Sequence, residues 1–182
     1  MASTPPLRYS GLQILLHWAT VALILVQIPV GLIMTGLDDG TAKNTLYELH
    51  KSFGLTLVGL VAIRLAVRAT VGAPPLVPGL PAWQRAAARG SHYALYALLV
   101  AVPLAGWAGT SACCAPVNLF WTVPLTLPVG GGMEAAKSIF AVHEILAFAL
   151  AALVLVHASA ALHHHYVRRD ETLRRMLPVS TR

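Results

Sequence analysis

Four long apolar segments dominate this sequence. They run from about Leu12 to Leu37, from Leu46 to Val67, from His92 to Ala112 and from Ile139 to Tyr166. A helix needs about 20 mainly apolar residues to cross a bilayer, and every one of these segments reaches that length. The sequence therefore predicts an all-α membrane protein, built as a bundle of four transmembrane helices.

The composition supports the same fold class. Only 11% of the residues are charged and 57% are hydrophobic, whereas a soluble domain carries about 25% charged residues. The 182 residues suit one transmembrane domain spanning positions 1–182. The net charge of +6 could indicate a nucleic-acid-binding protein, but no basic face alternates with aromatic residues. We expect the bilayer, and no nucleic acid, to be the partner of this surface.

The positive charges are distributed unevenly between the two sides of the predicted bundle. One side holds both chain ends and the connection between the second and third segments, and it collects all ten arginines. The other side holds only Lys43, Lys51 and Lys137, beside five acidic residues. Because cytoplasmic loops are enriched in Lys and Arg, we expect both termini to be cytoplasmic in a bacterial inner membrane.

The connection from Cys113 to Ser138 is long and apolar, and it contains Trp121. We expect it to lie as a lid over the outer mouth, with Trp107 and Trp121 as anchors at the membrane interface. The neighbouring Cys113 and Cys114 lack zinc-site spacing, and a disulfide between adjacent residues is strained and uncommon. We interpret them as structural or incidental.

The last apolar segment carries His143 near one end and His157 towards the other, before the triplet His163 to His165 at its end. Fourteen residues separate His143 from His157, which is about 21 Å along a helix and returns to nearly the same helix face. Ionisable residues inside a membrane are costly and usually functional. Both imidazoles therefore point to a function within the bilayer.

Two further histidines lie at matching depths. His17 lies near the inner end of the first segment, level with His157, and His50 lies near the outer end of the second, level with His143. Facing imidazoles at two levels predict two six-coordinate haem b groups, with iron held by His17 and His157 and by His50 and His143. The absence of a CxxCH motif excludes covalently attached haem c.

The fourteen-residue spacing assigns roles to other residues. Gly31 follows His17 by fourteen and leaves room at the outer level, and Arg64 follows His50 by fourteen, where its guanidinium could bind haem propionates. Gly54, one turn after His50, also leaves room for a macrocycle. We expect His92 to contact a propionate or transfer a proton, unless it is simply an interfacial polar residue. His164 lies on the same helix face as His157. We expect it to serve a quinone or a proton at the inner mouth, unless it is simply an interfacial histidine near the headgroups.

The chain resembles the bacterial dihaem cytochrome b561 family over nearly its whole length. The resemblance is carried by RYSGLQILLHW, LHKSFG, ARGSHYALYALLVAVPLAGW, the pair HE at His143, and HASAALHHHYVRRDETLRRMLP. It implies a four-helix transmembrane bundle for electron transport, with His17, His50, His143 and His157 as haem ligands and ubiquinone as a partner.

Within this family, a stand-alone chain of this length is most similar to the superoxide oxidases. That resemblance implies an oxidoreductase that oxidises superoxide to dioxygen at the outer face and reduces ubiquinone to quinol. Such an enzyme should attract an anion with positive charge, and the candidates are Lys51 and Lys137. Family members often carry a basic residue one turn before the ligand of the fourth helix, where this chain has Phe140.

Other functions compete with this prediction. The chain could relay electrons between quinone and a periplasmic redox protein or dehydrogenase, which the acidic outer surface would favour if the partner is basic. A histidine-based metal transporter would usually show intramembrane carboxylates or broken helices. Neither is visible here, because Glu48 and Glu144 belong to the outer side of the bundle. A purely structural subunit leaves the four histidines unexplained.

Overall fold

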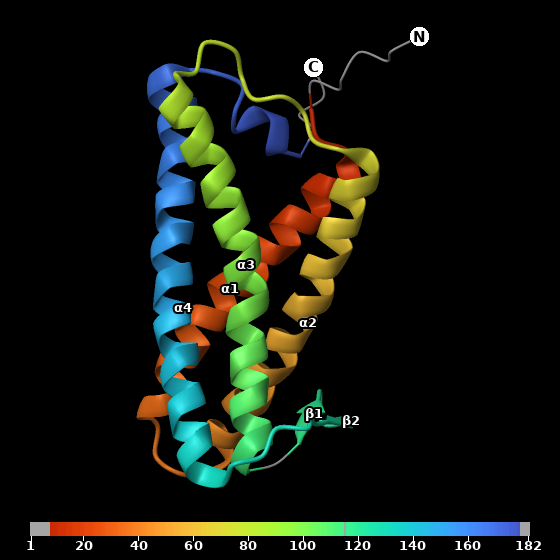
Figure 1. Ribbon diagram of the computed structural model, residues 1–182, viewed down its shortest axis with the longest axis vertical. Helices are drawn as coiled ribbons and strands as arrows, with labels where there is room; N and C mark the ends of the chain where they lie inside the picture. The colour runs from red at the N-terminus through yellow and green to blue at the C-terminus, as the bar shows by residue number, and fades with distance from the viewer. Residues whose placement is uncertain (1–7, 115, 179–182) are drawn as a thin grey trace.

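The computed structural model describes residues 8–114 and 116–178, and these residues fold into a bundle of four long helices. The helices are α1 (Gly11–Gly36), α2 (Thr41–Val71), α3 (Ala82–Cys113) and α4 (Gly132–His163) (Figure 1). All four are long and apolar enough to cross a membrane. The predicted fold class, a four-helix transmembrane bundle, is confirmed.

Three helices begin earlier than the apolar segments suggested. We expected starts near positions 46, 92 and 139, whereas α2, α3 and α4 begin at Thr41, Ala82 and Gly132. The additional turns are polar or small-residue sequence that hydropathy cannot recognise as helical, because a helix can extend beyond the bilayer core. At its end α4 continues into a π-helical turn, His164–Arg168, followed by a short 3₁₀ turn, Arg174–Met176.

Local sequence signals explain where the helices start. Ser10 and Gln13 form a capping box at the start of α1, in which each side chain accepts a hydrogen bond from the other residue's backbone N–H. Pro81 precedes α3. Because proline has no backbone N–H and its ring clashes with a preceding helical turn, the helix does not extend to the N-terminal side of this residue. Gly131 precedes α4 with a φ of 113°, a conformation that favours glycine.

A small apolar core fills the middle of the bundle. It contains a buried residue from every helix, with α1 packing chiefly on α2 and α3 chiefly on α4. These buried residues are Ile24, Leu57, Val61, Leu99 and Leu150. By contrast, large apolar side chains such as Leu15, Leu25, Ile145 and Leu155 are about two-thirds exposed on the outside. An apolar exterior around a small core is the pattern expected of a bundle surrounded by lipid.

The first and last described segments of the chain meet at one end of the bundle. Arg8 donates hydrogen bonds to the carbonyl groups of Arg174 and Leu177, and the Trp18 indole donates to Met176 O at 2.8 Å. Figure 1 shows the α2–α3 connection at this same end. We call it the terminal end, and the opposite one, which holds the α1–α2 and α3–α4 connections, the hairpin end.

The α3–α4 connection contains a β-hairpin that lies beside the bundle. Strands β1 (Val117–Leu119) and β2 (Val123–Leu125) pair in antiparallel register. The backbone N–H of Phe120 donates to the buried hydroxyl of Ser52 at 2.8 Å, and β1 packs on α2 (Figure 1). The expected lid over the mouth is therefore wrong, because Ser52 holds the hairpin against the flank of α2.

The two tryptophans of this region differ in their surroundings. The Trp107 indole donates to Leu125 O at 3.2 Å, so it fastens the hairpin to α3. Trp121 lies in the hairpin turn with 57% of its surface exposed. Of the two expected interface anchors, Trp121 is the one whose side chain is free to reach the headgroups.

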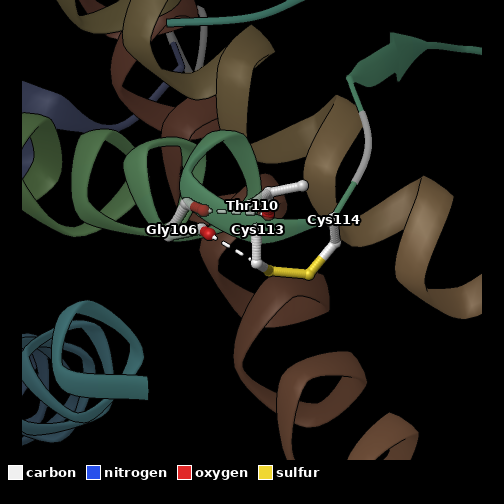
Figure 2. Close-up of a disulfide and its surroundings, with 5 residues drawn as sticks. Gly106, Thr110, Cys113 and Cys114 are labelled. Carbon is white, nitrogen blue, oxygen red and sulfur yellow. Dashed lines mark hydrogen bonds between the residues drawn. A yellow bond between two sulfur atoms is a disulfide. The ribbon is translucent and has the colours of Figure 1, made fainter. Parts of the chain in front are cut away.

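Cys113 and Cys114 are joined by a disulfide at the end of α3 (Figure 2). Figure 2 shows the bonded sulfur atoms beside the last turn of the helix, where Thr110 donates to Gly106 O and Cys114 N–H donates to Thr110 O. The disulfide joins the last residue of α3 to the residue that follows it, just before the hairpin begins. This is consistent with the structural role expected for the pair.

Candidate functional site

Residues at intervals of seven form one regular series in each of the four helices of the bundle interior. Each helix carries a histidine near the terminal end or the hairpin end and a buried apolar residue seven positions later. A glycine, an arginine or a second histidine follows after seven more positions. The four series are His17, Ile24 and Gly31; His50, Leu57 and Arg64; His92, Leu99 and Gly106; and His143, Leu150 and His157. Because seven residues are about two helical turns, each series lies along one helix face.

This spacing divides the interior into two polar levels separated by an apolar layer. The apolar layer consists of Ile24, Leu57, Leu99 and Leu150, whose side chains pack together. The terminal level contains His17, Arg64, His92 and His157. The hairpin level contains Gly31, His50, Gly106 and His143.

At the hairpin level, His50 of α2 faces His143 of α4. Their ring centroids lie 6.1 Å apart. His143 Nδ1 lies 2.8 Å from Val102 O, and since a carbonyl only accepts, Nδ1 carries the proton. The lone pair of His143 Nε2 is therefore available, as in metal-binding histidines oriented by a backbone carbonyl. His50 Nδ1 is buried without a hydrogen-bond partner among the described residues.

At the terminal level, His157 of α4 lies between two other imidazoles. Its ring centroid is 6.4 Å from that of His17 on α1 and 5.5 Å from that of His92 on α3. Two imidazoles that bind one iron from opposite sides, through bonds of about 2 Å, would have centroids about 6.3 Å apart. The His17–His157 and His50–His143 pairs match this spacing, and the His92–His157 pair is too close. His92 is therefore better suited to a position beside the site than to the role of a metal ligand.

Two glycines bring helix backbones against the imidazoles of the hairpin level. A Cβ atom added to Gly31 would lie 3.1 Å from His50 Cε1, and one added to Gly106 would lie 3.0 Å from both Cε1 and Nδ1 of His143. Gly54 faces Gln27 and Pro103 instead. The paired donors and the glycines beside their rings fit a planar group held between two axial histidines. We expected Gly54 to leave this space, but the glycines beside the rings are Gly31 and Gly106.

Arg64 lies beside His17, as its position fourteen residues after His50 predicted. One of its guanidinium nitrogens is 3.1 Å from His17 Nδ1, and the guanidinium carbon lies 5.6 Å from the centre of the Tyr96 ring. Arginine only donates hydrogen bonds, so in this contact the His17 proton sits on Nε2. Binding of a metal by Nε2 requires Arg64 to leave Nδ1, and a carboxylate within reach would give it another partner.

The contribution of α3 to both levels escaped the sequence analysis. We applied the fourteen-residue interval to the other three helices but not to His92, where it leads to Gly106. The signal was available, because Gly106 and Gly109 follow each other at helical spacing on one face. An added Cβ at Gly109 would meet the Phe140 ring at 2.7 Å, so small residues here let α3 approach α4 closely.

The two lysines expected to attract an anion both form ion pairs. Lys51 pairs with Glu48 one turn earlier on α2, with less than a quarter of either side chain exposed, and Lys137 pairs with Glu134 at 3.1 Å. Lys43, the third lysine of the hairpin end, pairs with Asp39 at 3.0 Å. The described residues of this end therefore present no lysine without a neighbouring carboxylate.

His164 lies at the terminal end in a polar cluster formed by the chain after α4. Its Nδ1 is 2.6 Å from Asp170 Oδ2, and Thr172 N–H donates to Asp170 Oδ1 at 2.9 Å. Burial alone would raise the pKa of Asp170, but hydrogen bonds from Thr172 and His164 outweigh it and hold the pKa below its usual value. Asp170 is therefore a carboxylate at neutral pH, and it orients the His164 ring.

Comparison with known proteins identifies relatives of this chain. A family model described as prokaryotic cytochrome b561 matches residues 8–179. The chain is similar to cytochrome b561 homolog 2 of Escherichia coli, with 34% identity over 97% of this chain and 94% of the relative. It is also similar to cytochrome b561 homolog 1 of the same organism, with 32% identity over 94% and 97%. A probable superoxide oxidase CybB of Yersinia pestis is 28% identical over 94% and 96%.

Proposed function

Because the chain belongs to the prokaryotic cytochrome b561 family, we propose that it carries electrons across the membrane through two haem b groups. The observation that supports this best is the presence of two imidazole pairs, 6.4 and 6.1 Å apart between centroids, at two levels of the bundle. The family implies haem b, membrane-spanning helices and electron transport. The presence of two polar levels supports a count of two haems.

The protein's own residues would hold and separate these groups. His17 and His157 would be the axial ligands at the terminal level, and His50 and His143 those at the hairpin level. When bound, each haem supplies one-electron oxidation and reduction of its iron. The apolar layer around Leu57 excludes water between the levels, and Arg64 would bind a propionate.

The charge distribution supports an orientation with the terminal end in the cytoplasm. All arginines among the described residues lie at that end or in the last turns of the helices leading to it, whereas the three lysines lie at the hairpin end. By the positive-inside rule the hairpin end would face the periplasm, with the protein in the inner membrane. This places the cysteine pair in an oxidising compartment, where disulfides persist.

Ubiquinone would be reduced at the terminal end. Formation of a quinol consumes two electrons and two protons, so the site needs a group that can pass protons from the cytoplasm. His164 is suited to this role because Asp170 accepts from Nδ1 and balances the charge of a protonated ring. His92, 5.5 Å from His157 between ring centroids, would be a neighbouring polar group of the same end.

We propose superoxide as the electron donor at the hairpin end. Two superoxide ions each give up one electron and leave as dioxygen, and one ubiquinone takes both electrons with two protons. Similarity to a relative named as a probable superoxide oxidase supports this reaction. Lys51, directly after His50, and Lys137, six residues before His143, would then attract the anion.

A periplasmic redox protein is the second candidate donor, and the ion pairs of the lysines favour it. Since Glu48, Glu134 and Asp39 neutralise all three lysines, the hairpin end carries a net negative charge from Asp38 and Glu144. Such a surface attracts a basic protein better than a small anion.

A pulse of superoxide applied to the purified protein distinguishes the two donors. If superoxide is the donor, haem reduction should be fast, and Lys51→Gln with Lys137→Gln should slow it, because removing both cations leaves a more negative surface. The measurement is the rise of reduced haem absorption after the pulse, with Lys43→Gln as the control away from the haem ligands. Slow reduction that neither lysine affects would favour the redox protein.

Arg64→Leu tests the propionate contact. We expect the variant to bind both haems, with a lower reduction potential at the terminal level, because a nearby cation stabilises the reduced iron. Potentiometric titration of the two haems measures this, with Arg64→Lys as the variant that keeps the charge. An unchanged potential would mean that the propionates have other partners.

A further inference from the structure

A cavity lies at the terminal end, between the end of α2 and the start of α3. Its volume is about 350 Å³, and its roof is the connection that runs from Ala73 to Leu76. Arg68 on α2 and Arg89 on α3 line it from opposite sides, and the Tyr93 ring forms part of the wall. None of the functions discussed above uses these residues.

The two arginines of the cavity have no protein partner in the part of the chain that the structure describes. Most other arginines of this end are held, as Arg8 is by backbone carbonyl groups and Arg168 by Gln84 and Asp170. Within residues 8–114 and 116–178, neither Arg68 nor Arg89 forms an ion pair or a side-chain hydrogen bond. Two guanidinium groups facing one cavity repel each other unless an anion lies between them.

The remaining lining suits a molecule with an apolar part. Leu65, Pro74 and Leu76 form an apolar wall, and Leu65 is 40% exposed on the outside of α2. The cavity lies where α2 ends at Val71 and α3 begins at Ala82, a level at which lipid headgroups meet the acyl chains. The polar group of an amphiphile would meet the arginines while its chain follows the surface of α2.

The roof of the cavity is held in place by residues from elsewhere in the chain. Gln13 of α1 donates to Gly72 O at 2.7 Å, and Arg175 donates to Pro75 O at 2.6 Å. A ligand would therefore enter a site whose roof is already positioned, which lowers the entropic cost of binding.

We propose that this cavity binds the phosphate of an anionic phospholipid between Arg68 and Arg89. Basic pockets between transmembrane helices, at the level of the headgroups, are suited to phosphate groups of lipids. The propionates of a haem at the terminal level are the other source of anionic groups, because His92 also lines this cavity. The proposal is independent of the electron donor and of the direction of electron flow.

Lipid binding to the haem-loaded protein tests the proposal. Native mass spectrometry of detergent-solubilised protein would measure binding of phosphatidylglycerol against phosphatidylcholine. Each arginine near a phosphate contributes about fivefold in affinity, so we expect Arg68→Gln with Arg89→Gln to lower phosphatidylglycerol binding about thirtyfold. Arg169→Gln is the matched control, because Arg169 is exposed, unpaired among the described residues and outside the cavity.

Two results would overturn the proposal. One is equal binding of the two lipids by the unaltered protein. The other is loss of a haem, or a shifted reduced spectrum, in the double variant while its preference for phosphatidylglycerol stays the same, which would assign the cavity to the propionates. If the double variant does not fold, the exposed Arg89→Gln alone should lower phosphatidylglycerol binding about fivefold, and no change there would also reject the proposal.

Discussion

His17→Ala and His157→Ala should each yield a protein with one haem per chain, and both should lack the same haem. The two residues lie on α1 and α4, 140 positions apart in the sequence (157 − 17), yet their rings lie 6.4 Å apart at the terminal level. A six-coordinate haem loses one of its two axial bonds in either variant. His50→Ala and His143→Ala should instead remove the haem of the hairpin level, where the centroids are 6.1 Å apart.

The measurement is a dithionite-reduced absorption spectrum, with haem and protein quantified in the same sample. His163→Ala serves as the matched control, since His163 lies on α4 with an exposed side chain, and it should retain two haems. If the four variants each lost a different mixture of the two haems, the pairing by level would be wrong. If His92→Ala removed the terminal haem and His17→Ala did not, His92 would replace His17 as the ligand.

Gly106→Val should remove the haem of the hairpin level without touching a ligand. A Cβ atom at this position would lie 3.0 Å from two atoms of the His143 ring, closer than carbon atoms pack. The ring cannot retreat easily, because its Nδ1 is bonded to Val102 O on the same helix as Gly106. Overpacking of this kind costs about 1–3 kcal/mol, which corresponds to about a fivefold to 150-fold weaker site.

Gly59→Ala is the control for this substitution, because nothing lies within 4 Å of a Cβ added there. Alanine should stabilise α2 slightly at that position, since glycine lowers helix stability by about 1 kcal/mol. Haem content and thermal stability of the two variants separate the local effect from a general one. A Gly106→Val protein that keeps both haems with unchanged spectra would show that α3 does not confine His143.

The fold class was predictable because it depends on composition along the chain. Four apolar segments of spanning length permit few alternatives, since every backbone polar group in a bilayer must be bonded within its own segment. The depth of each histidine also follows from the sequence, because the rise of a helix is fixed at about 1.5 Å per residue. These two regularities were enough to predict two levels and the depths of the four histidines proposed as ligands, but not the contribution of Gly106.

The neighbours of those residues were not predictable, because they depend on how the helices rotate and approach one another. The fourteen-residue interval from His92 marks the level of Gly106, but only the packing of the helices brings its backbone against the ring of His143, whereas Gly54 faces Gln27 and Pro103. The same holds for the hairpin, which the buried hydroxyl of Ser52 holds beside α2 and the Trp107 indole fastens to α3. Helix ends outside the apolar segments, such as the start of α3, carry too little hydropathy signal to be located.

The sequence by itself determined that the chain crosses a membrane four times with histidines at two depths, because hydropathy and helical rise are properties of single segments. Only the tertiary structure decided how closely the imidazoles approach each other, which lysines are neutralised and which arginines have no partner among the described residues. Those properties arise between segments, where the contact of two side chains depends on the packing of all four helices.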